Sequence, residues 1–243
     1  MKKLILTLGA ILFLTSTVYP CFDTYLFLKR ASMVYPFKSL VLELNGEYSI
    51  NSLRSPQDDS FLSTGSIYYG LWRNFSFQFS IGSDEKARNE FKIDYYAIRG
   101  VYNLYSSFMN RYTLDIILEH RGKLGEKNNE FELSLPNIFY VSNFVYVIHP
   151  NLSYGFESKD FTLGGHAGAF YTFNEAGLIG LGFEYASVHS SSYAGQRLTK
   201  SEYSASLFFG AKIGDKIYLQ NEIAKGLANS RDIGFAITTK IIL

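Results

Sequence analysis

The sequence predicts an all-β protein in which about twelve antiparallel strands close into a transmembrane β-barrel. Three observations support this fold class. Large apolar side chains recur at every second position in many segments, 17% of the 243 residues are aromatic, and no segment after the N-terminus has the uninterrupted apolar length of a membrane-spanning helix. Ten or fourteen strands fit the same pattern.

The period of two is clearest in residues 74–81, NFSFQFSI, where every second side chain is large and apolar. Successive side chains of a strand point to opposite faces, so one face of this segment suits hydrocarbon and the other suits water. The same alternation recurs in residues 40–50, 112–121, 202–209, 217–223 and 235–243.

A soluble β-sandwich also alternates, but its polar face is usually richer in Lys and charged pairs than the Ser, Gln, Gly and Tyr positions found here. In lipid every backbone polar group needs an internal partner, and only closure of the sheet removes its edges. The pattern therefore favours a membrane barrel over a sandwich.

Twelve strands are expected at residues 38–50, 63–72, 74–82, 92–103, 110–121, 130–141, 144–157, 161–173, 178–188, 200–213, 216–225 and 232–243. The connections near 73–74, 105–109, 142–143, 174–177 and 214–216 are mostly tight and are expected to face the periplasm. Those at 51–62, 83–91, 122–129, 189–199 and 226–231 are mostly longer and are expected to face outward, as is the short one at 158–160. Pro136 and Pro150 make the strands of 130–157 the hardest pair to place.

The N-terminus has the charge placement of a signal peptide, with LILTLGAILFL at residues 4–14 behind Met1-Lys2-Lys3. We expect a signal peptide over 1–20 with cleavage near 17–21, a periplasmic N-terminal segment over 21–37, and the barrel over 38–243. The lone Cys21 allows a lipoprotein, or an unpaired thiol in a periplasmic tail. Residues 22–36 do not alternate, so they cap the periplasmic mouth, plug the lumen or hang free.

Charge gives no support for nucleic-acid binding. Without Lys2 and Lys3, 21 of the 23 basic residues remain against 22 acidic ones, and no basic cluster is present.

The face assignment sends many charged side chains inward, with more acids than Lys and Arg among them. An acidic lumen favours cations or neutral polar solutes over anions, whereas pairing of these charges across the lumen would fill it. The residues expected to line the lumen and set its selectivity are Glu43, Glu47, Asp94, Arg99, Asp115, Glu119, Arg121, Glu132, His149, Glu157, His166, Glu184, Glu202, Lys212, Glu222 and Lys240.

His149 and His166 fall on neighbouring strands and both point inward in this register. Such a pair can bind a ligand or belong to a hydrogen-bond network. No carboxylate or cysteine spacing completes a metal site, so no metal and no cofactor are expected.

An enzyme remains an alternative because of His189, Ser191 and Glu202 at an expected outer loop and the start of the next strand. The His-x-Ser pair with a downstream Glu resembles the arrangement in the outer-membrane lipid A deacylase family. The resemblance implies that His189 is the base, Ser191 the nucleophile and Glu202 the residue that orients the base.

Two segments carry a second resemblance. Residues 70–82, GLWRNFSFQFSIG, resemble a strand-turn-strand of outer-membrane transporter-like proteins, a group that includes outer-membrane proteins of phenol meta-pathway clusters. Residues 225–243, KGLANSRDIGFAITTKIIL, resemble the C-terminal end of the same proteins. The last strand also resembles the signal read by the barrel-assembly machinery, except that Leu243 replaces the usual terminal Phe or Trp.

Three functions follow as hypotheses. The first is a bacterial outer-membrane porin or facilitator that passes or binds a small solute, with a preference for cations and no covalent chemistry. The second is an outer-membrane lipid A or phospholipid hydrolase, and the third a structural or adhesive barrel with a filled lumen. Expected partners are outer-membrane lipids, lipopolysaccharide, the barrel-assembly machinery and an unidentified solute.

Overall fold

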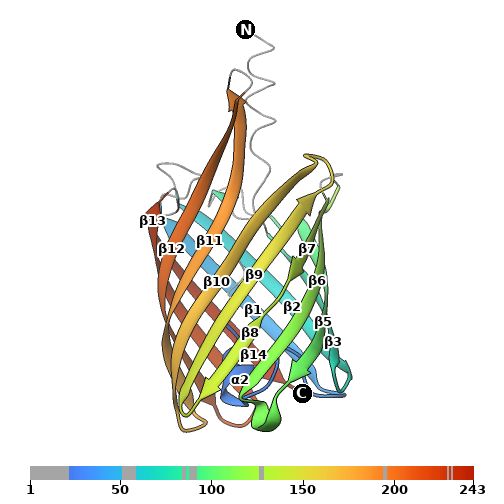
Figure 1. The fold of residues 1–243 in the computed structure, drawn as a ribbon, viewed down its shortest axis with the longest axis vertical. Helices are drawn as coiled ribbons and strands as arrows, with labels where there is room; N and C mark the ends of the chain where they lie inside the picture. The colour runs from blue at the N-terminus through green and yellow to red at the C-terminus, as the bar shows by residue number, and fades with distance from the viewer. Residues whose placement is uncertain are drawn as a thin grey trace.

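The computed structural model describes residues 22–50, 59–83, 86–87, 92–125, 129–193, 196–228, 230 and 232–243, with side chains described outside 86–87 and 188–200. These residues form a tall barrel of tilted antiparallel strands (Figure 1). Its strands are β1 Leu40–Ile50, β2 Ser60–Trp72, β3 Phe75–Gly82, β4 Lys86–Ala87, β5 Tyr95–Ser106, β6 Tyr112–Lys123, β7 Asn129–Ser134, β8 Asn137–Val141, β9 Phe144–Gly155, β10 Asp160–Phe173, β11 Gly177–Tyr193, β12 Gln196–Ile213, β13 Ile217–Ala228 and β14 Ile233–Ile242.

Twelve strands make up the wall in the described part of the chain. Strands β7 and β8 occupy successive parts of one position between β6 and β9, and the two-residue β4 pairs only with the end of β2. The ring closes because β1 pairs with β2 on one side and with β14 on the other. The predicted closed twelve-strand barrel is confirmed.

Pro136 explains why one wall strand is recorded in two parts. Proline has no N–H to donate to the ladder and is tolerated only where neighbouring pairing is interrupted. The ladder continues around it, because Leu135 N donates to Pro150 O at 3.0 Å and Asp115 N donates to Pro136 O at 3.0 Å. The inside-outside alternation is therefore preserved from β7 into β8.

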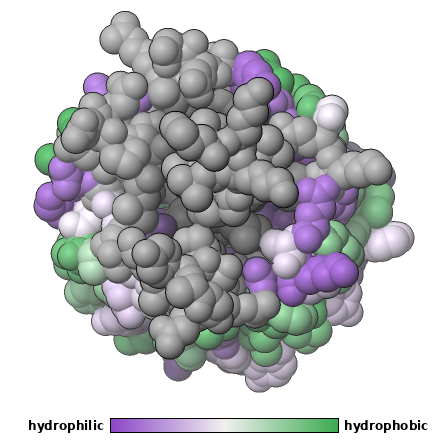
Figure 2. All heavy atoms as spheres, turned by 90° about the horizontal axis from the view of Figure 1, so that it is seen from above, coloured by the Kyte–Doolittle hydropathy of each residue, from purple (hydrophilic) through white to green (hydrophobic). Residues whose placement is uncertain are grey.

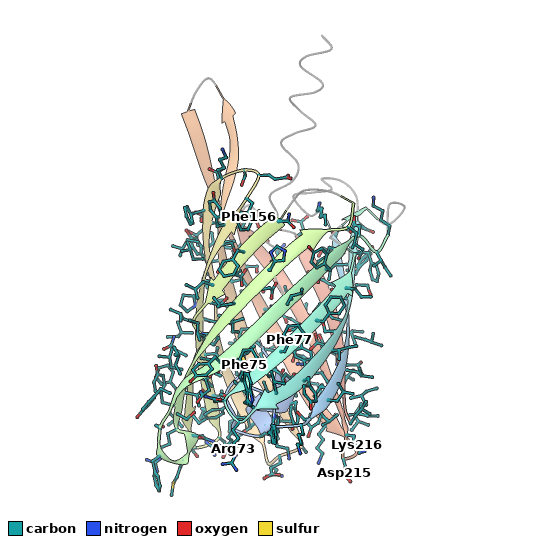
Figure 3. All side chains as sticks on the ribbon, turned by 90° about the vertical axis from the view of Figure 1, so that its right-hand side faces the viewer. Arg73, Phe75, Phe77, Phe156, Asp215 and Lys216 are labelled. Carbon is teal, nitrogen blue, oxygen red and sulfur yellow. The ribbon has the colours of Figure 1, made fainter. Side chains whose placement is uncertain are left out.

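The two ends of the barrel differ as the sequence predicts. Short turns join the strands at one end, where Figure 3 shows Arg73, Asp215 and Lys216, and the β11–β12 hairpin projects from the other (Figure 1). The short-turn end includes Gly214, whose φ of +66° suits glycine.

The sequence predicts an outer loop at 189–199, and this prediction is wrong. Strand β11 continues to Tyr193 and β12 begins at Gln196, and His189 pairs with Thr199 in the ladder. Polarity predicted a loop here, but Ser, Thr and Tyr also pair well across strands, and a ribbon above a membrane needs no apolar face.

Residues 22–36, hereafter the N-terminal insert, lie inside the barrel at the short-turn end. They contain a short helix, α2 Thr24–Leu28, which Asp23 caps because its carboxylate accepts from Leu26 N at 3.2 Å (Figure 1). All five residues of α2 are buried. Among the described residues, no helix is long and apolar enough to cross a membrane.

Candidate functional site: the barrel lumen

The wall has an apolar outside and a polar inside. In β3 the exposed residues are Phe77, Phe79 and Ile81, whereas Ser76, Gln78 and Ser80 are buried. Viewed along the long axis, hydrophobic residues lie on the circumference (Figure 2), and Phe75 and Phe77 lie on the outer wall in Figure 3. An apolar exterior on a closed antiparallel barrel is the arrangement that a bilayer requires.

One group of lumen charges lies on β5, β6 and β7. Glu119 is 2% exposed and binds both Arg99 and Arg121. Arg121 also reaches Glu132, with Nη2 3.6 Å from Oε2, and Ser134 Oγ donates to Glu132 Oε1 at 2.9 Å. Both guanidinium groups are therefore neutralised within the wall.

A second group lies on β9 to β13. His149 and His166 are opposite one another in the ladder, with ring centroids 5.8 Å apart. His166 Nδ1 lies 3.5 Å from Glu184 Oε1, and Ser204 Oγ donates to Glu184 Oε2 at 2.8 Å. Glu222 on β13 lies on the inner face two strands from Glu184 and carries a like charge. This group contains no Lys or Arg.

A third group joins the N-terminal insert to the wall. Lys240 on β14 binds Asp23 of the insert, and its Nζ lies 2.9 Å from Glu43 Oε2 and 2.7 Å from Tyr35 Oη. Lys240 is 7% exposed, so its charge depends on these two carboxylates.

Tyr35 completes this group as a donor. Its hydroxyl donates to Asp23 Oδ2 at 2.5 Å, and its ring lies against Tyr68 with centroids 4.7 Å apart. Burial, and to a smaller extent the charge of Asp23, raises the pKa of the Tyr35 hydroxyl well above its usual value. Tyr35 therefore stays protonated and keeps donating.

The insert also contacts the wall far from Lys240. Met33 N donates to Asp115 Oδ2 at 2.6 Å, and Tyr140 Oη donates to Ala31 O at 2.7 Å. On the opposite side, Phe22 stacks on Phe208 with ring centroids 5.1 Å apart. Contacts with β6, β8, β12 and β14 surround the insert, so it fills the lumen at this level.

Small wall residues make room for the insert. A Cβ added at Gly210 would lie 2.2 Å from Thr24 Oγ1, and one at Gly182 would lie 2.7 Å from the Phe22 ring. Neither glycine can become alanine unless its neighbour moves.

Most predicted lumen residues occupy the inner face. Glu157 does not, because β9 ends at Gly155 and Glu157 lies exposed in the following turn. Asp94 is buried just before β5, and Lys212 pairs with Asp215 at 3.4 Å near the short-turn end. The residues found on the inner face of strands are Glu43, Glu47, Arg99, Asp115, Glu119, Arg121, Glu132, His149, His166, Glu184, Glu202, Lys212, Glu222 and Lys240.

The sequence analysis does not predict two residues that belong to the third lumen group. Asp23 and Tyr35 belong to the N-terminal segment, whose lack of periodicity gave no direction to its side chains. The one signal in the sequence is Asp23 directly before the apolar segment TYLFL, because Asp is a common N-cap.

The predicted hydrolase residues fall partly outside the described residues, since the side chains of His189 and Ser191 are not among them. The backbone register places Glu202 opposite Ala186 and His189 opposite Thr199, three pairs apart in the ladder. Within the described ranges, no group of His, Cys, Asp and Glu is arranged to hold a metal ion.

Comparisons with known proteins give matches in structure alone. No family model matches the sequence, and no match is found among curated proteins. The COG4313 outer membrane channel from Pseudomonas putida F1 superimposes with a TM-score of 0.70 at 10% identity, covering 86% of this chain and 97% of that one. The NanC porin gives 0.61 at 11% identity, covering 83% and 100%, and the KdgM porin gives 0.57 at 11%, covering 83% and 98%.

These three proteins are an outer membrane channel and two porins, and identities of 10–11% establish similarity of fold alone. The chain therefore has the fold of the outer-membrane channel β-barrels.

Proposed function

We propose that the protein is an outer-membrane porin that passes small cationic or neutral polar solutes and excludes anions. The observation that carries this proposal is the unequal pairing of lumen charges. The four predicted lumen cations all have carboxylate partners: Arg99, Arg121, Lys212 and Lys240. By contrast Asp115, Glu184 and Glu222 have no Lys or Arg at ion-pair distance among the described residues.

The unequal pairing matters because a lumen concentrates the field of its uncompensated charges. Field lines focus between low-dielectric walls, so a few unpaired carboxylates raise the local concentration of cations and repel anions. An anion-passing lumen needs accessible Arg or Lys, and here the four predicted lumen cations are held by acids. The fold similarity to channels supports a pore and is silent on its solute.

The N-terminal insert sets a condition on transport. It fills the lumen at the level of Lys240, so a solute passes only when the insert shifts from its seat. The insert is held by a few polar contacts and aromatic packing rather than by strand pairing, which makes such a shift cheaper than opening the wall.

Solute uptake by proteoliposomes tests the proposal directly. Refolded full-length protein is placed in vesicles with the same potassium chloride solution inside and outside, and the entry of radiolabelled arabinose, lysine or gluconate is followed. We expect entry of arabinose, entry of lysine in exchange for potassium, and much slower entry of gluconate. A folded barrel that admits none of the three solutes, or that admits gluconate fastest, would contradict the proposal.

A further inference from the structure

The second lumen group is built around two carboxylates that no strong base neutralises. Glu184 on β11 and Glu222 on β13 both lie on the inner face of the wall, on strands separated only by β12, so their like charges disfavour each other. Glu184 is satisfied in part by Ser204, whereas His166 approaches it at 3.5 Å. Two like charges on one wall are costly unless one carboxyl takes up a proton or a cation comes between them.

His149 supplies an independent sign of a binding site. The residue is 8% exposed and its Nδ1 has no hydrogen-bond partner among the described residues. Its ring lies next to His166, the residue that approaches Glu184. A buried ring nitrogen without a partner is unfavourable, so a donor or acceptor from outside the protein is expected here.

The site is closed below and reachable from above. Phe22 of the insert lies under His166, with ring centroids 6.5 Å apart, and forms a floor with Phe208. The side chains of His166 and Glu184 keep 10% and 12% of their surface exposed. A ligand that enters from the β11–β12 hairpin end therefore meets these groups before it meets the insert.

The available groups fit an ammonium better than a metal ion. Carboxylate oxygens and imidazole nitrogens can accept the three N–H bonds of a primary ammonium, and its single charge relieves the repulsion of the two acids. No metal-holding arrangement exists among the described residues. We propose that the wall formed by His149, His166, Glu184, Ser204 and Glu222 binds the primary ammonium group of a small organic amine.

This inference deepens the proposed function and rests on it, since the amine reaches the wall through the upper lumen. Isothermal titration calorimetry of the refolded full-length protein in detergent micelles tests it, with putrescine as the probe, 1,4-butanediol as its neutral analogue and calcium chloride as a bare cation. We expect heat of binding with putrescine and none with butanediol.

Variants assign the binding to the site. Glu184→Gln and Glu222→Gln should each weaken putrescine binding about tenfold, the loss typical of one charge-assisted hydrogen bond. Glu175→Gln, on the exposed turn between β10 and β11, should leave binding unchanged. Ser204→Ala, a smaller change beside Glu184, should weaken putrescine binding about threefold. This variant tests the site if neither Gln variant refolds.

Three results would overturn the site: putrescine affinity equal in wild type and in the Gln variants, butanediol binding as well as putrescine, or Glu184-dependent calcium binding that displaces putrescine. Because binding in micelles requires no transport, the two proposals fail separately. Glu184-dependent binding by a barrel that passes no solute would contradict the porin alone, and transport without such binding would contradict the site alone.

Discussion

The Lys240 ammonium on the last strand binds the Asp23 carboxylate at the start of the N-terminal insert, residues that are 217 positions apart in the chain. Lys240 Nζ also lies 2.9 Å from Glu43 on the first strand. One cation therefore ties the insert to the seam where the barrel closes, and the seat of the insert depends on charges that substitution can remove singly.

Asp23→Asn should loosen the insert without damaging the wall. Asn caps a helix as well as Asp does, so α2 keeps its cap, and Lys240 keeps Glu43 as its partner. The insert loses its ion pair to the wall, and we expect larger or more frequent conductance steps in planar bilayers. The matched control is Glu175→Gln, in an exposed turn at the same end, which should behave as wild type. Identical steps in all three proteins would mean that this ion pair does not hold the insert.

A disulfide between the insert and the wall should have the opposite effect. A Cβ added at Gly210 would lie 3.0 Å from Thr24 Cβ, a few tenths of an ångström below the usual separation of about 3.5–4.5 Å in disulfides. We expect Thr24→Cys/Gly210→Cys, in a Cys21→Ser background, to lower conductance when oxidised and to recover on reduction. If conductance were the same with the disulfide oxidised and reduced, solutes would pass without movement of the insert.

Gly182 should be sensitive to the smallest substitution. An added Cβ would lie 2.5 Å from Ser206 Oγ and 2.7 Å from the Phe22 ring, whereas one at Gly46 meets nothing within 4 Å. Overpacking of this kind costs about 1–3 kcal/mol. We expect Gly182→Ala to lower the urea midpoint of unfolding, followed by the fluorescence of the single tryptophan, Trp72, and Gly46→Ala to leave it unchanged. Equal midpoints would indicate that Phe22 is not seated against β11.

A charge placed on the outer wall should destabilise the barrel more at the bilayer midplane than near the interface. Phe79 is in the middle of β3 and 40% exposed, and Phe156 is in the turn after β9 (Figure 3). Arg on a lipid-facing barrel position costs about 2–4 kcal/mol at the bilayer midplane and about 0–1 kcal/mol near the interface. Urea unfolding in vesicles should therefore show a large loss for Phe79→Arg and a small one for Phe156→Arg. If the order were reversed, the apolar belt would not be where the exposed residues place it.

The wall of the barrel was predictable because hydrophobic alternation is a local property. All twelve expected strands exist, and β3, expected at 74–82, is found at Phe75–Gly82. The predictions that fail concern the ends of the strands. The sequence predicts that Glu157 belongs to a strand, but this strand stops at Gly155. It also predicts a loop at 189–199, because polarity alone does not separate a loop from a ribbon surrounded by water.

The sequence predicts which side chains line the lumen but not which of them contact one another. Alternation alone sends Glu119 and Arg99 to the inside, whereas their contact depends on the register Arg99↔Glu119, which the sequence does not state. The insert was beyond reach, because residues 22–36 have no period and their position is decided by aromatic packing and by Lys240, distant in sequence.

The reversal potential of single channels in a potassium chloride gradient tests whether the pore prefers cations. Full-length protein is reconstituted in a planar bilayer, as wild type and as Asp23→Asn, and the voltage of zero current is measured. We expect a potential displaced toward that of potassium, and a smaller displacement when Glu119→Gln leaves Arg99 and Arg121 with one acid fewer. A potential displaced toward that of chloride, or a folded barrel that stays silent in both forms, would contradict a cation-preferring pore.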